Sequence, residues 1–385
     1  MKKLAIITTH PIQYYAPVFK LLHERNNISV RVYYTWGEKA LDKYDPGFEK
    51  KVTWDIPLLE GYPYEWALNT SAYPGTHHFK GVVTPNLTEQ VNTWQPDAVL
   101  FFGWAYHGHL KAIRYFKNKI PVFFRGDSTL LDETGRIKSM LKSIYLKWVY
   151  KHIDHAFYVG TNNRNYFKKY GLKDNQLSFA PHAVDNDRFA GDKSTDAQLL
   201  RANLGITRDE ILILFAGKLE NKKSPLLLLD ACLSMNKPGV HLLFIGNGAL
   251  ERDLKTQAGN STNVHFMPFQ NQTAMPTAFQ AANVFCLPSQ GPGETWGLAV
   301  NEAMACGKPV LVSDKVGCAV DLVKDGYNGA IFQNKQLDDL VSKLTKLISS
   351  KAALKEYGHN SKAMINNWSF QKVAEAIENK LNESL

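Results

Sequence analysis

Apolar residues in the first half of the chain occur in short β-rich runs, separated by longer stretches with helical spacing. This alternation predicts a parallel sheet whose strands are joined by crossover helices. The predicted strands are Lys3–Thr8, Val30–Tyr34, Ala98–Phe102, Val122–Phe124 and Ala156–Val159. Residues 40–90 are rich in Tyr, Trp, Pro and Gly and lack a clear period, so we predict long loops there.

A second alternation of the same kind begins after about residue 190. Its predicted strands are Ile211–Phe215, Val240–Ile245, Val264–Phe266, Val284–Leu287, Val310–Ser313 and Ala330–Phe332. Two successive doubly wound α/β units predict twin Rossmann-like domains, with ligands at the C-terminal ends of the strands. We place an N-terminal domain at 1–187, a C-terminal domain at 188–365, and a C-terminal helix at 366–385 that packs back toward the N-terminal domain.

The basic charge of the chain is concentrated in its first half. The net charge is +9; residues 1–190 contain 25 Lys and Arg against 17 Asp and Glu, whereas 191–385 contain 20 against 19. A basic domain attracts nucleic acid, anionic lipid or phosphorylated substrates. No aromatic–basic recognition module appears in the sequence, which disfavours nucleic acid as the partner.

The segment richest in chemistry reads PSQGPGETWGLAVNEAMACGKP (288–309). A predicted strand leads into a Gly/Pro-rich loop, and we expect a helix to begin with Thr295 as its N-cap. Backbone N–H groups of Trp296, Gly297 and Leu298 at the positive end of that helix would form a cradle for a diphosphate.

Carboxylates on both sides of this cradle are candidates for hydroxyl groups of a sugar nucleotide. Glu294 lies in the loop and Glu302 lies eight residues later, a separation of ~12 Å along a helix. That distance matches the reach from a hexose, across a diphosphate, to a ribose. Carboxylates accept hydrogen bonds from sugar hydroxyls, often two at once.

Two further loops follow predicted strands of the second half. The first reads AGKLENKKSP (216–225), where Lys218 and Lys223 are expected to converge on the phosphates without a metal. The second reads GNGALE (246–251) and contributes Gly246. Base selection in this fold often uses backbone contacts near 267–270, so Phe269 is a candidate contact to the donor.

The order and spacing of these loops resemble the family-4 retaining glycosyltransferases, which have the GT-B fold of two Rossmann-like domains facing a cleft. PHAVD (181–185) resembles the family's junction segment, and the resemblance is strong over 181–375 and general before that. It implies that Glu294 contacts the transferred sugar, Glu302 the ribose, and Lys218, Lys223 and the amides around Gly297 the diphosphate. It also implies that 1–187 is the acceptor-side domain and 188–365 the nucleotide-sugar-binding domain, and that transfer proceeds with retention and without a metal ion.

The chain departs from the family pattern in three places. Lys218 stands where an Arg is usual, so the charge remains but the bidentate geometry is lost. The first loop, THPIQYY (9–15), lacks the common glycine pair, and His10 is the best candidate there. After the fourth N-terminal strand the family often has a His, whereas this chain has FRGDS (124–128), so Arg125 or Asp127 is the expected contact to sugar or acceptor.

The segment 136–151 is predicted to be a helix in which the apolar residues Ile137, Met140, Leu141, Ile144 and Val149 approximate one stripe. One interpretation is a core helix with a solvated basic face. The other is a helix that docks on anionic lipid headgroups, which would suit a lipid-linked acceptor. The sequence leaves both open.

Together these features predict a retaining hexosyltransferase that uses a nucleoside diphosphate sugar and a glycan or lipid-linked acceptor, as in bacterial surface polysaccharide biosynthesis. No cofactor, metal or nucleic acid is expected. The short apolar run at the N-terminus ends too soon for a signal peptide, so we expect a cytoplasmic protein, with contact to the inner face of the membrane left open. The alternatives are a sugar-nucleotide epimerase of the same fold and a non-catalytic nucleotide-sugar-binding subunit.

Overall fold

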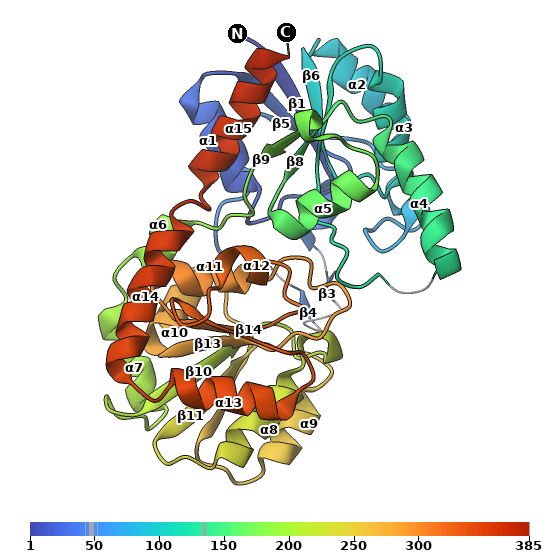
Figure 1. The fold of residues 1–385 in the computed structure, drawn as a ribbon. Coiled ribbons are helices and arrows are strands. Elements are labelled where there is room, and N and C mark those ends of the chain that lie inside the picture. The colour runs from blue at the N-terminus through green and yellow to red at the C-terminus, as the bar shows by residue number, and fades with distance from the viewer. Residues whose placement is uncertain (43, 46–49, 52, 134–135, 385) are drawn as a thin grey trace. The chain divides into compact units, whose positions relative to one another are not determined.

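The computed structural model describes residues 1–42, 44–45, 50–51, 53–133 and 136–384, and these form two compact units. The first unit holds the described residues numbered 1–42, 53–182 and 370–384. The second holds 183–369 together with the short antiparallel strands β3 (Tyr44–Asp45) and β4 (Lys50–Lys51). Each unit is a parallel sheet covered by helices (Figure 1).

The sheet of the first unit has the strand order β5-β2-β1-β6-β7-β8-β9 among the described residues, with every pair parallel. Its elements in chain order are β1 (Lys3–Thr8), α1 (Ala16–Arg25), β2 (Ser29–Tyr34), η1 (Glu38–Asp42), β5 (Tyr64–Trp66), η2 (Phe79–Gly81), α2 (Leu87–Thr93), β6 (Ala98–Phe102), α3 (His107–Phe116), β7 (Val122–Arg125), α4 (Arg136–Tyr150), β8 (His155–Tyr158), α5 (Thr161–Lys169), η3 (Asp174–Gln176), β9 (Leu177–Phe179) and α15 (Phe370–Glu383). The order reverses between β1 and β6, so the loops after these two strands diverge there.

The sheet of the second unit has the order β12-β11-β10-β13-β14-β15 in the part of the chain that is described. Its elements are α6 (Asn186–Ala190), α7 (Ser194–Asn203), β10 (Ile211–Ala216), η4 (Asn221–Lys223), α8 (Pro225–Met235), β11 (Val240–Ile245), α9 (Glu251–Ala258), β12 (Val264–Met267), α10 (Met275–Ala281), β13 (Val284–Leu287), α11 (Leu298–Ala305), β14 (Val310–Ser313), α12 (Ala319–Leu322), β15 (Gly329–Phe332), α13 (Leu337–Leu347) and α14 (Lys351–Ile365). This is the doubly wound order, and its reversal lies between β10 and β13.

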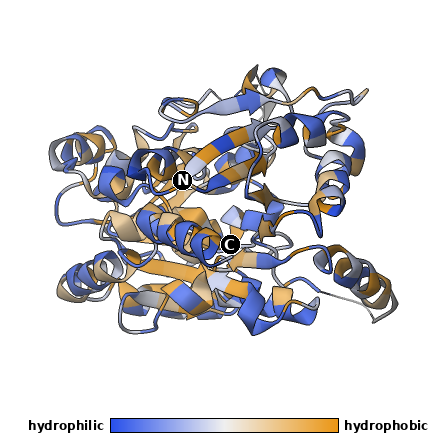
Figure 2. Ribbon diagram, turned by 90° about the horizontal axis from the view of Figure 1, so that it is seen from above, coloured by the Kyte–Doolittle hydropathy of each residue, from blue (hydrophilic) through white to orange (hydrophobic). Residues whose placement is uncertain are grey.

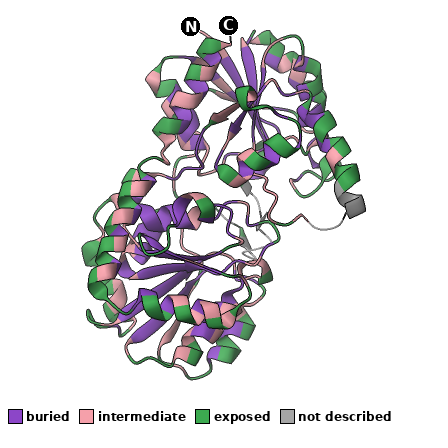
Figure 3. Ribbon diagram, viewed as in Figure 1, coloured by how far each residue is buried: buried purple, intermediate pink, exposed green. Residues whose placement is uncertain are grey.

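The central strands are buried on both faces, which explains why they read as continuous apolar runs in the sequence. In β10 and β11 every residue is buried, and both strands are purple in Figure 3, while Figure 2 shows orange, hydrophobic stretches along strands of the sheets. The predicted two-domain, Rossmann-like α/β fold is therefore confirmed, and each predicted strand corresponds to a strand of these sheets. The sequence analysis missed the edge strands β5 and β9, which are three residues long and only partly buried.

The C-terminal helix α15 belongs to the first unit, although the chain reaches it from the second. It packs against α1 (Figure 1). The carboxylate of Glu378 accepts hydrogen bonds from Arg25 at 2.9 and 3.0 Å and from Asn27 at 3.1 Å, and Lys2 donates to the carbonyl oxygen of Asn382 at 2.9 Å. The two ends of the chain are thus tied together within one unit.

Helix α4 differs from the first interpretation of its sequence. Of the predicted apolar stripe, Val149 is buried, but Met140, Leu141 and Ile144 are exposed. Ile137 lies outside the residues whose side chains the structure describes. The helix is therefore not a core helix with only a basic outer face. No helix among the described residues is both long and apolar enough to cross a bilayer.

Glu133, just before α4, is the centre of a polar cluster. Its carboxylate accepts hydrogen bonds from Lys169, Tyr170 and Lys142. Burial by itself would raise the pKa of Glu133, but these hydrogen bonds outweigh burial and lower the pKa to about 2 from 4.5. The ionised carboxylate therefore ties α4 to the end of α5.

We expect Glu133→Gln to lower the free energy of unfolding by about 1–2 kcal/mol at pH 7, less than the full pKa shift implies because both lysines are partly exposed. A folded-state pKa below the unfolded value means that the stabilisation is present above pH 4.5 and is lost as the pH falls toward 2. Urea unfolding of wild type and variant at pH 7, 5 and 3 measures this difference. A constant difference over that range would contradict the assignment, and Glu89→Gln on the exposed side of α2 is the control.

Candidate functional site

The reversal of strand order in the second unit brings two chemistry-bearing loops together. One follows β10 and leads through η4 into α8, and the other follows β13 and leads into α11. Parallel neighbours end at the same edge of a sheet, so both loops lie at the C-terminal edge, where ligands of such sheets bind. Lys218 and Lys223 are on the first loop and Glu294 is on the second.

Lys223 and Glu294 form an ion pair, with Nζ 2.5 Å from Oε2. The carboxylate is only 7% exposed and also accepts a hydrogen bond from the Ser289 hydroxyl at 2.8 Å. The backbone carbonyl of Glu294 accepts from the Gly317 amide at 3.1 Å. A carboxylate has about four lone-pair sites and an ammonium has three donors, so both groups keep capacity for a ligand.

The start of α11 differs from the prediction in one detail. The N-cap residue is Gly297, not Thr295, and the helix begins at Leu298. Gly297 has φ +96°, a left-handed conformation that glycine adopts at little cost, and no side chain caps the first amides. These amides lie at the positive end of the helix dipole, where the sequence analysis placed the diphosphate cradle, and that cradle stays a prediction.

Trp296 contributes to this loop through its backbone. Its indole N–H donates to Asn301 Oδ1 at 2.8 Å inside the core, and its side chain is buried. The Trp296 carbonyl accepts from the Cys318 amide at 2.9 Å. Glu302 lies further along α11 and is only 5% exposed. The second unit thus holds two buried carboxylates, Glu294 and Glu302, on one loop–helix segment.

Glycines hold the loops after β10 and β11 close together. Gly246 has φ +143°, and a Cβ built on it would lie 2.0 Å from the carbonyl oxygen of Gly217. The Leu219 amide donates to the Asn247 carbonyl at 2.9 Å, and the Asn247 side chain accepts from the Phe269 amide at 2.9 Å. Gly246 and Phe269 are therefore placed with the loop of Lys218, and the structure adds Asn247, a link that sequence reasoning missed.

In the first unit the two predicted contact residues at and just after the end of β7, Arg125 and Asp127, have different surroundings. Asp127 follows β7, and its carboxylate lies 4.0 Å from His182 Nε2. Arg125 ends β7 and is buried, and its guanidinium donates to the backbone carbonyls of Ala180 at 2.6 Å and Pro181 at 2.8 Å. The donors of Arg125 therefore anchor the segment after β9, and the assignment of Arg125 or Asp127 to sugar or acceptor stays a prediction.

His182 is a candidate functional residue that sequence reasoning did not single out. It is buried, and burial lowers its pKa to about 4, with Arg125 adding to the effect and Asp127 opposing it, so the imidazole is neutral at pH 7. The ring of Tyr15 is stacked on it at 6.1 Å between centroids, and burial raises the pKa of Tyr15. The sequence signal that could have pointed to His182 is its position shortly after β9, the last strand of the first sheet along the chain.

The histidines after β1 and β6 have different surroundings. His10 Nδ1 lies 2.9 Å from the Thr9 hydroxyl, and its ring meets Trp36 edge-on at 5.3 Å. His109 is fully buried between the Thr35 hydroxyl at 2.7 Å and the Gly103 carbonyl at 2.8 Å, and burial lowers its pKa to about 4. His109 is therefore a structural residue, whereas His10 stays a prediction.

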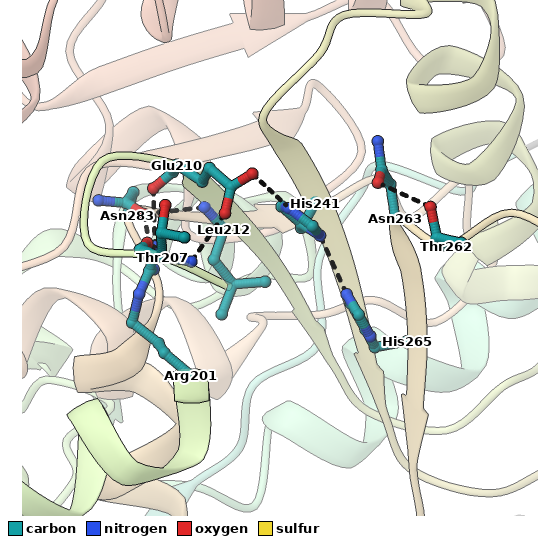
Figure 4. Close-up of polar contacts among 9 residues, drawn as sticks. All are labelled: Arg201, Thr207, Glu210, Leu212, His241, Thr262, Asn263, His265 and Asn283. Carbon is teal, nitrogen blue, oxygen red and sulfur yellow. Dashed lines mark hydrogen bonds and ion pairs between the residues drawn. The ribbon is translucent and has the colours of Figure 1, made fainter. Parts of the chain in front are cut away.

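Figure 4 shows a second polar cluster of the second unit. It lies near the N-terminal ends of β11 and β12, whereas the candidate loops follow the C-terminal ends of the strands. His241 Nδ1 is 3.1 Å from His265 Nε2, and His241 Nε2 is 3.4 Å from a carboxylate oxygen of Glu210. Arg201 donates to the Glu210 carbonyl at 2.7 Å and connects α7 to β10. Within the described part of the chain, no group of three or more His, Cys, Asp or Glu is arranged to hold a metal ion.

Comparison with known proteins gives these loops a context. Residues 196–364 match the family Glycosyl transferases group 1. A D-inositol 3-phosphate glycosyltransferase of Mycobacterium avium is 33% identical over 177 residues, which cover 44% of this chain and 40% of that protein. One from Rhodococcus erythropolis is 26% identical over 220 residues, covering 54% and 48%. The chain thus matches less than half the length of these relatives.

Solved structures match over the whole chain. Anabaena HepE in complex with UDP gives a TM-score of 0.74 at 18% identity, covering 100% of both chains. Sucrose-phosphate synthase from Thermosynechococcus elongatus gives 0.73 at 16% identity, covering 100% of this chain and 99% of that chain. WaaG, a glycosyltransferase involved in lipopolysaccharide biosynthesis, gives 0.69 at 14% identity, covering 98% and 99%. At these identities the likeness shows the fold, which is the GT-B fold of glycosyltransferases.

Proposed function

Because residues 196–364 match the glycosyl transferases group 1 family, we propose that this chain transfers a hexose-type sugar from a nucleoside diphosphate sugar to a glycan or lipid-linked acceptor, with retention of configuration. The observation that carries the proposal is the Lys223–Glu294 ion pair at the strand reversal, in which Glu294 lies on the same segment as the amides that begin α11. A cation, a buried carboxylate and free amides at one sheet edge match the diphosphate and hydroxyls of such a donor.

In this proposal each group has one task. Lys218, Lys223 and the amides of Gly297 and Leu298 stabilise the negative charge that develops on the departing diphosphate. Glu294 accepts hydrogen bonds from hydroxyls of the transferred sugar, and Glu302 accepts from the ribose. The acceptor attacks on the face from which the diphosphate leaves, and its proton passes to the leaving phosphate. The bond broken joins the anomeric carbon to the phosphate oxygen, and the bond formed joins the same carbon to the acceptor oxygen.

The cations Lys218 and Lys223 are proposed to replace the metal ion that other transferases use at the diphosphate. Uridine diphosphate is the first nucleotide to test, because HepE was solved in complex with UDP and with UDP-glucose. We propose a cytoplasmic location, and bacterial surface polysaccharide as the class of product.

We expect one nucleoside diphosphate among UDP, GDP and ADP to raise the melting temperature by about 5–10 °C at 100 times its dissociation constant, which corresponds to about 2.7 kcal/mol. CMP, which lacks the second phosphate, is the control. The shift should be the same with and without EDTA, because the proposed cradle contains no metal. A thermal-shift screen measures it, and no shift with any diphosphate would contradict the donor site.

Turnover distinguishes the transferase from its two rivals. An epimerase would convert the sugar nucleotide without an acceptor, which proton NMR of the sugar detects. A non-catalytic subunit would show the thermal shift but neither hydrolysis nor transfer. The transferase should release the nucleotide slowly in water and faster when a glycan acceptor is added.

A further inference from the structure

Helix α4 exposes large apolar side chains on its outward face. Met140, Leu141 and Ile144 are 59–62% exposed, and Tyr145 and Trp148 are 41% and 37% exposed. We call these five residues the α4 surface. Figure 3 shows the outer turns of α4 in green and pink.

The α4 surface lies opposite the part of the helix that packs on the sheet. Successive residues of a helix are about 100° apart, so the five residues fall within an arc of about 140°. Leu146, Val149 and Tyr150, which are buried, centre on the opposite side. An ordinary surface helix is apolar on one side only. The α4 surface is therefore apolar area that the packing of this unit does not require.

Aromatic side chains widen this surface toward α3. The rings of Tyr145 and Trp148 are stacked at 5.8 Å, and the guanidinium of Arg114 from α3 lies 5.4 Å over Trp148. On the same helix, Tyr115 is exposed and Lys119 Nζ lies 3.2 Å over its ring. Aromatic rings with adjacent cations are typical of protein surfaces at the membrane–water boundary.

The charge around the α4 surface has one sign. The segments 107–119 and 136–151 contain four and five Lys or Arg residues, respectively, and no Asp or Glu. Lys147 on α4 and Lys151, directly after its last residue, are exposed. Lys142 is paired with Glu133 and Lys117 with Asp154, so some of this charge is compensated within the unit. The cations beside the apolar residues complement an anionic surface.

We propose that the α4 surface docks on a lipid bilayer with anionic headgroups. Met140, Leu141 and Ile144 enter the boundary of the acyl region, Tyr145 and Trp148 lie at headgroup level, and the surrounding cations bind lipid phosphates. A nucleic acid offers phosphates but no apolar phase for the aliphatic residues. For a helix that faces only water, exposing these aliphatic side chains would be unfavourable.

Docking goes beyond the proposed reaction and does not depend on it. It would hold the enzyme at the surface where a lipid-linked acceptor is found. Its test uses vesicles without nucleotide or acceptor, so a failure of the proposed transfer and a failure of docking give different results.

The experiment is co-flotation of the full chain with vesicles of phosphatidylglycerol and phosphatidylcholine, compared with pure phosphatidylcholine, in 0.1 M salt. The wild type should bind the anionic vesicles at least tenfold more tightly. The triple variant Met140→Ser, Leu141→Ser, Ile144→Ser should lower that affinity by about 10- to 100-fold. Lys147→Glu with Lys151→Glu should lower it about tenfold, with a smaller effect at 0.5 M salt.

The matched control removes the same kind of exposed apolar side chain elsewhere. Leu68, Leu199 and Val320 are 57–65% exposed and lie outside α3 and α4. Leu68→Ser, Leu199→Ser, Val320→Ser should leave vesicle binding unchanged. As a readout independent of flotation, anionic vesicles should shift the tryptophan emission of the wild type to shorter wavelength, and Trp148→Phe should reduce this shift.

Three results would overturn the proposal. The first is no binding of the wild type to anionic vesicles. The second is an equal loss of binding in the α4 triple variant and the control triple variant, each folded by its melting curve. The third is a concentration-dependent dimer in sedimentation that the α4 triple variant abolishes, because the α4 surface would then be an interface between two copies of this chain.

Discussion

Glu294→Gln should reduce glycosyl transfer by about 10³-fold or more while leaving the affinity for the nucleoside diphosphate within a few-fold of wild type. The side chain is almost completely buried, accepts from Ser289 and is paired with Lys223 at 2.5 Å, so its charge and position are fixed before a ligand arrives. Groups that are fixed in this way stabilise charge in a transition state without reorganisation, and removal of one such group typically costs about 10²–10³ in rate. Glutamine keeps the shape of the side chain, removes the charge and replaces one acceptor oxygen with an N–H donor.

The variant should fold, with a free energy of unfolding lowered by about 1–2 kcal/mol because Lys223 is left without its carboxylate but keeps some access to solvent. Donor turnover with acceptor and calorimetric titration with the nucleoside diphosphate separate the two effects. Asp209→Asn, which removes an exposed ion pair with Lys351, is the control and should change neither. Wild-type turnover in the Glu294 variant would remove Glu294 from the proposed site.

The parts of the fold that were predictable from sequence are those where one physical rule decides. Strands such as β10 and β11 are buried on both faces, and a continuous apolar run between Gly-rich loops has few other solutions. Once the strands are known, the doubly wound order places the loops of Lys223 and Glu294 at one sheet edge. The sequence therefore predicted that these two loops meet at one sheet edge, which the structure shows, whereas their role in binding stays a prediction.

Other features depend on contacts between distant segments of the chain. The spacing of apolar residues along the sequence does not reveal such contacts. The direct pairing of Lys223 with Glu294 and the use of Arg125 by the carbonyls of Ala180 and Pro181 are of this kind. In α4 the apolar residues cover opposite sides of the helix, and the sequence alone does not say which side packs inward. The short edge strand β5 lacked a signal because its residues are only partly buried.

The backbone contact between the loops after β10 and β11 gives the prediction with the largest expected effect on stability. Gly246→Ala places a Cβ 2.0 Å from the carbonyl oxygen and 3.0 Å from the carbonyl carbon of Gly217, at a φ of +143°. Real Cβ atoms do not approach backbone so closely, so the ends of two adjacent central strands must separate. We expect the free energy of unfolding to fall by about 3–5 kcal/mol, with a loss of the thermal shift by nucleotide because the loop of Lys218 moves.

Gly259→Ala separates the effect of backbone conformation from that of close approach. Gly259 also has a positive φ, +55°, but an added Cβ would meet nothing within 4 Å. This variant should cost only about 1–3 kcal/mol and keep nucleotide binding, because it carries the strain of a positive φ without the clash. Thermal melts of both variants, with and without the nucleoside diphosphate, provide the comparison. If Gly246→Ala melted at the temperature of Gly259→Ala and still responded to nucleotide, the loops after β10 and β11 would not need their close contact. The donor cradle would then have to be assigned to the β13–α11 segment alone.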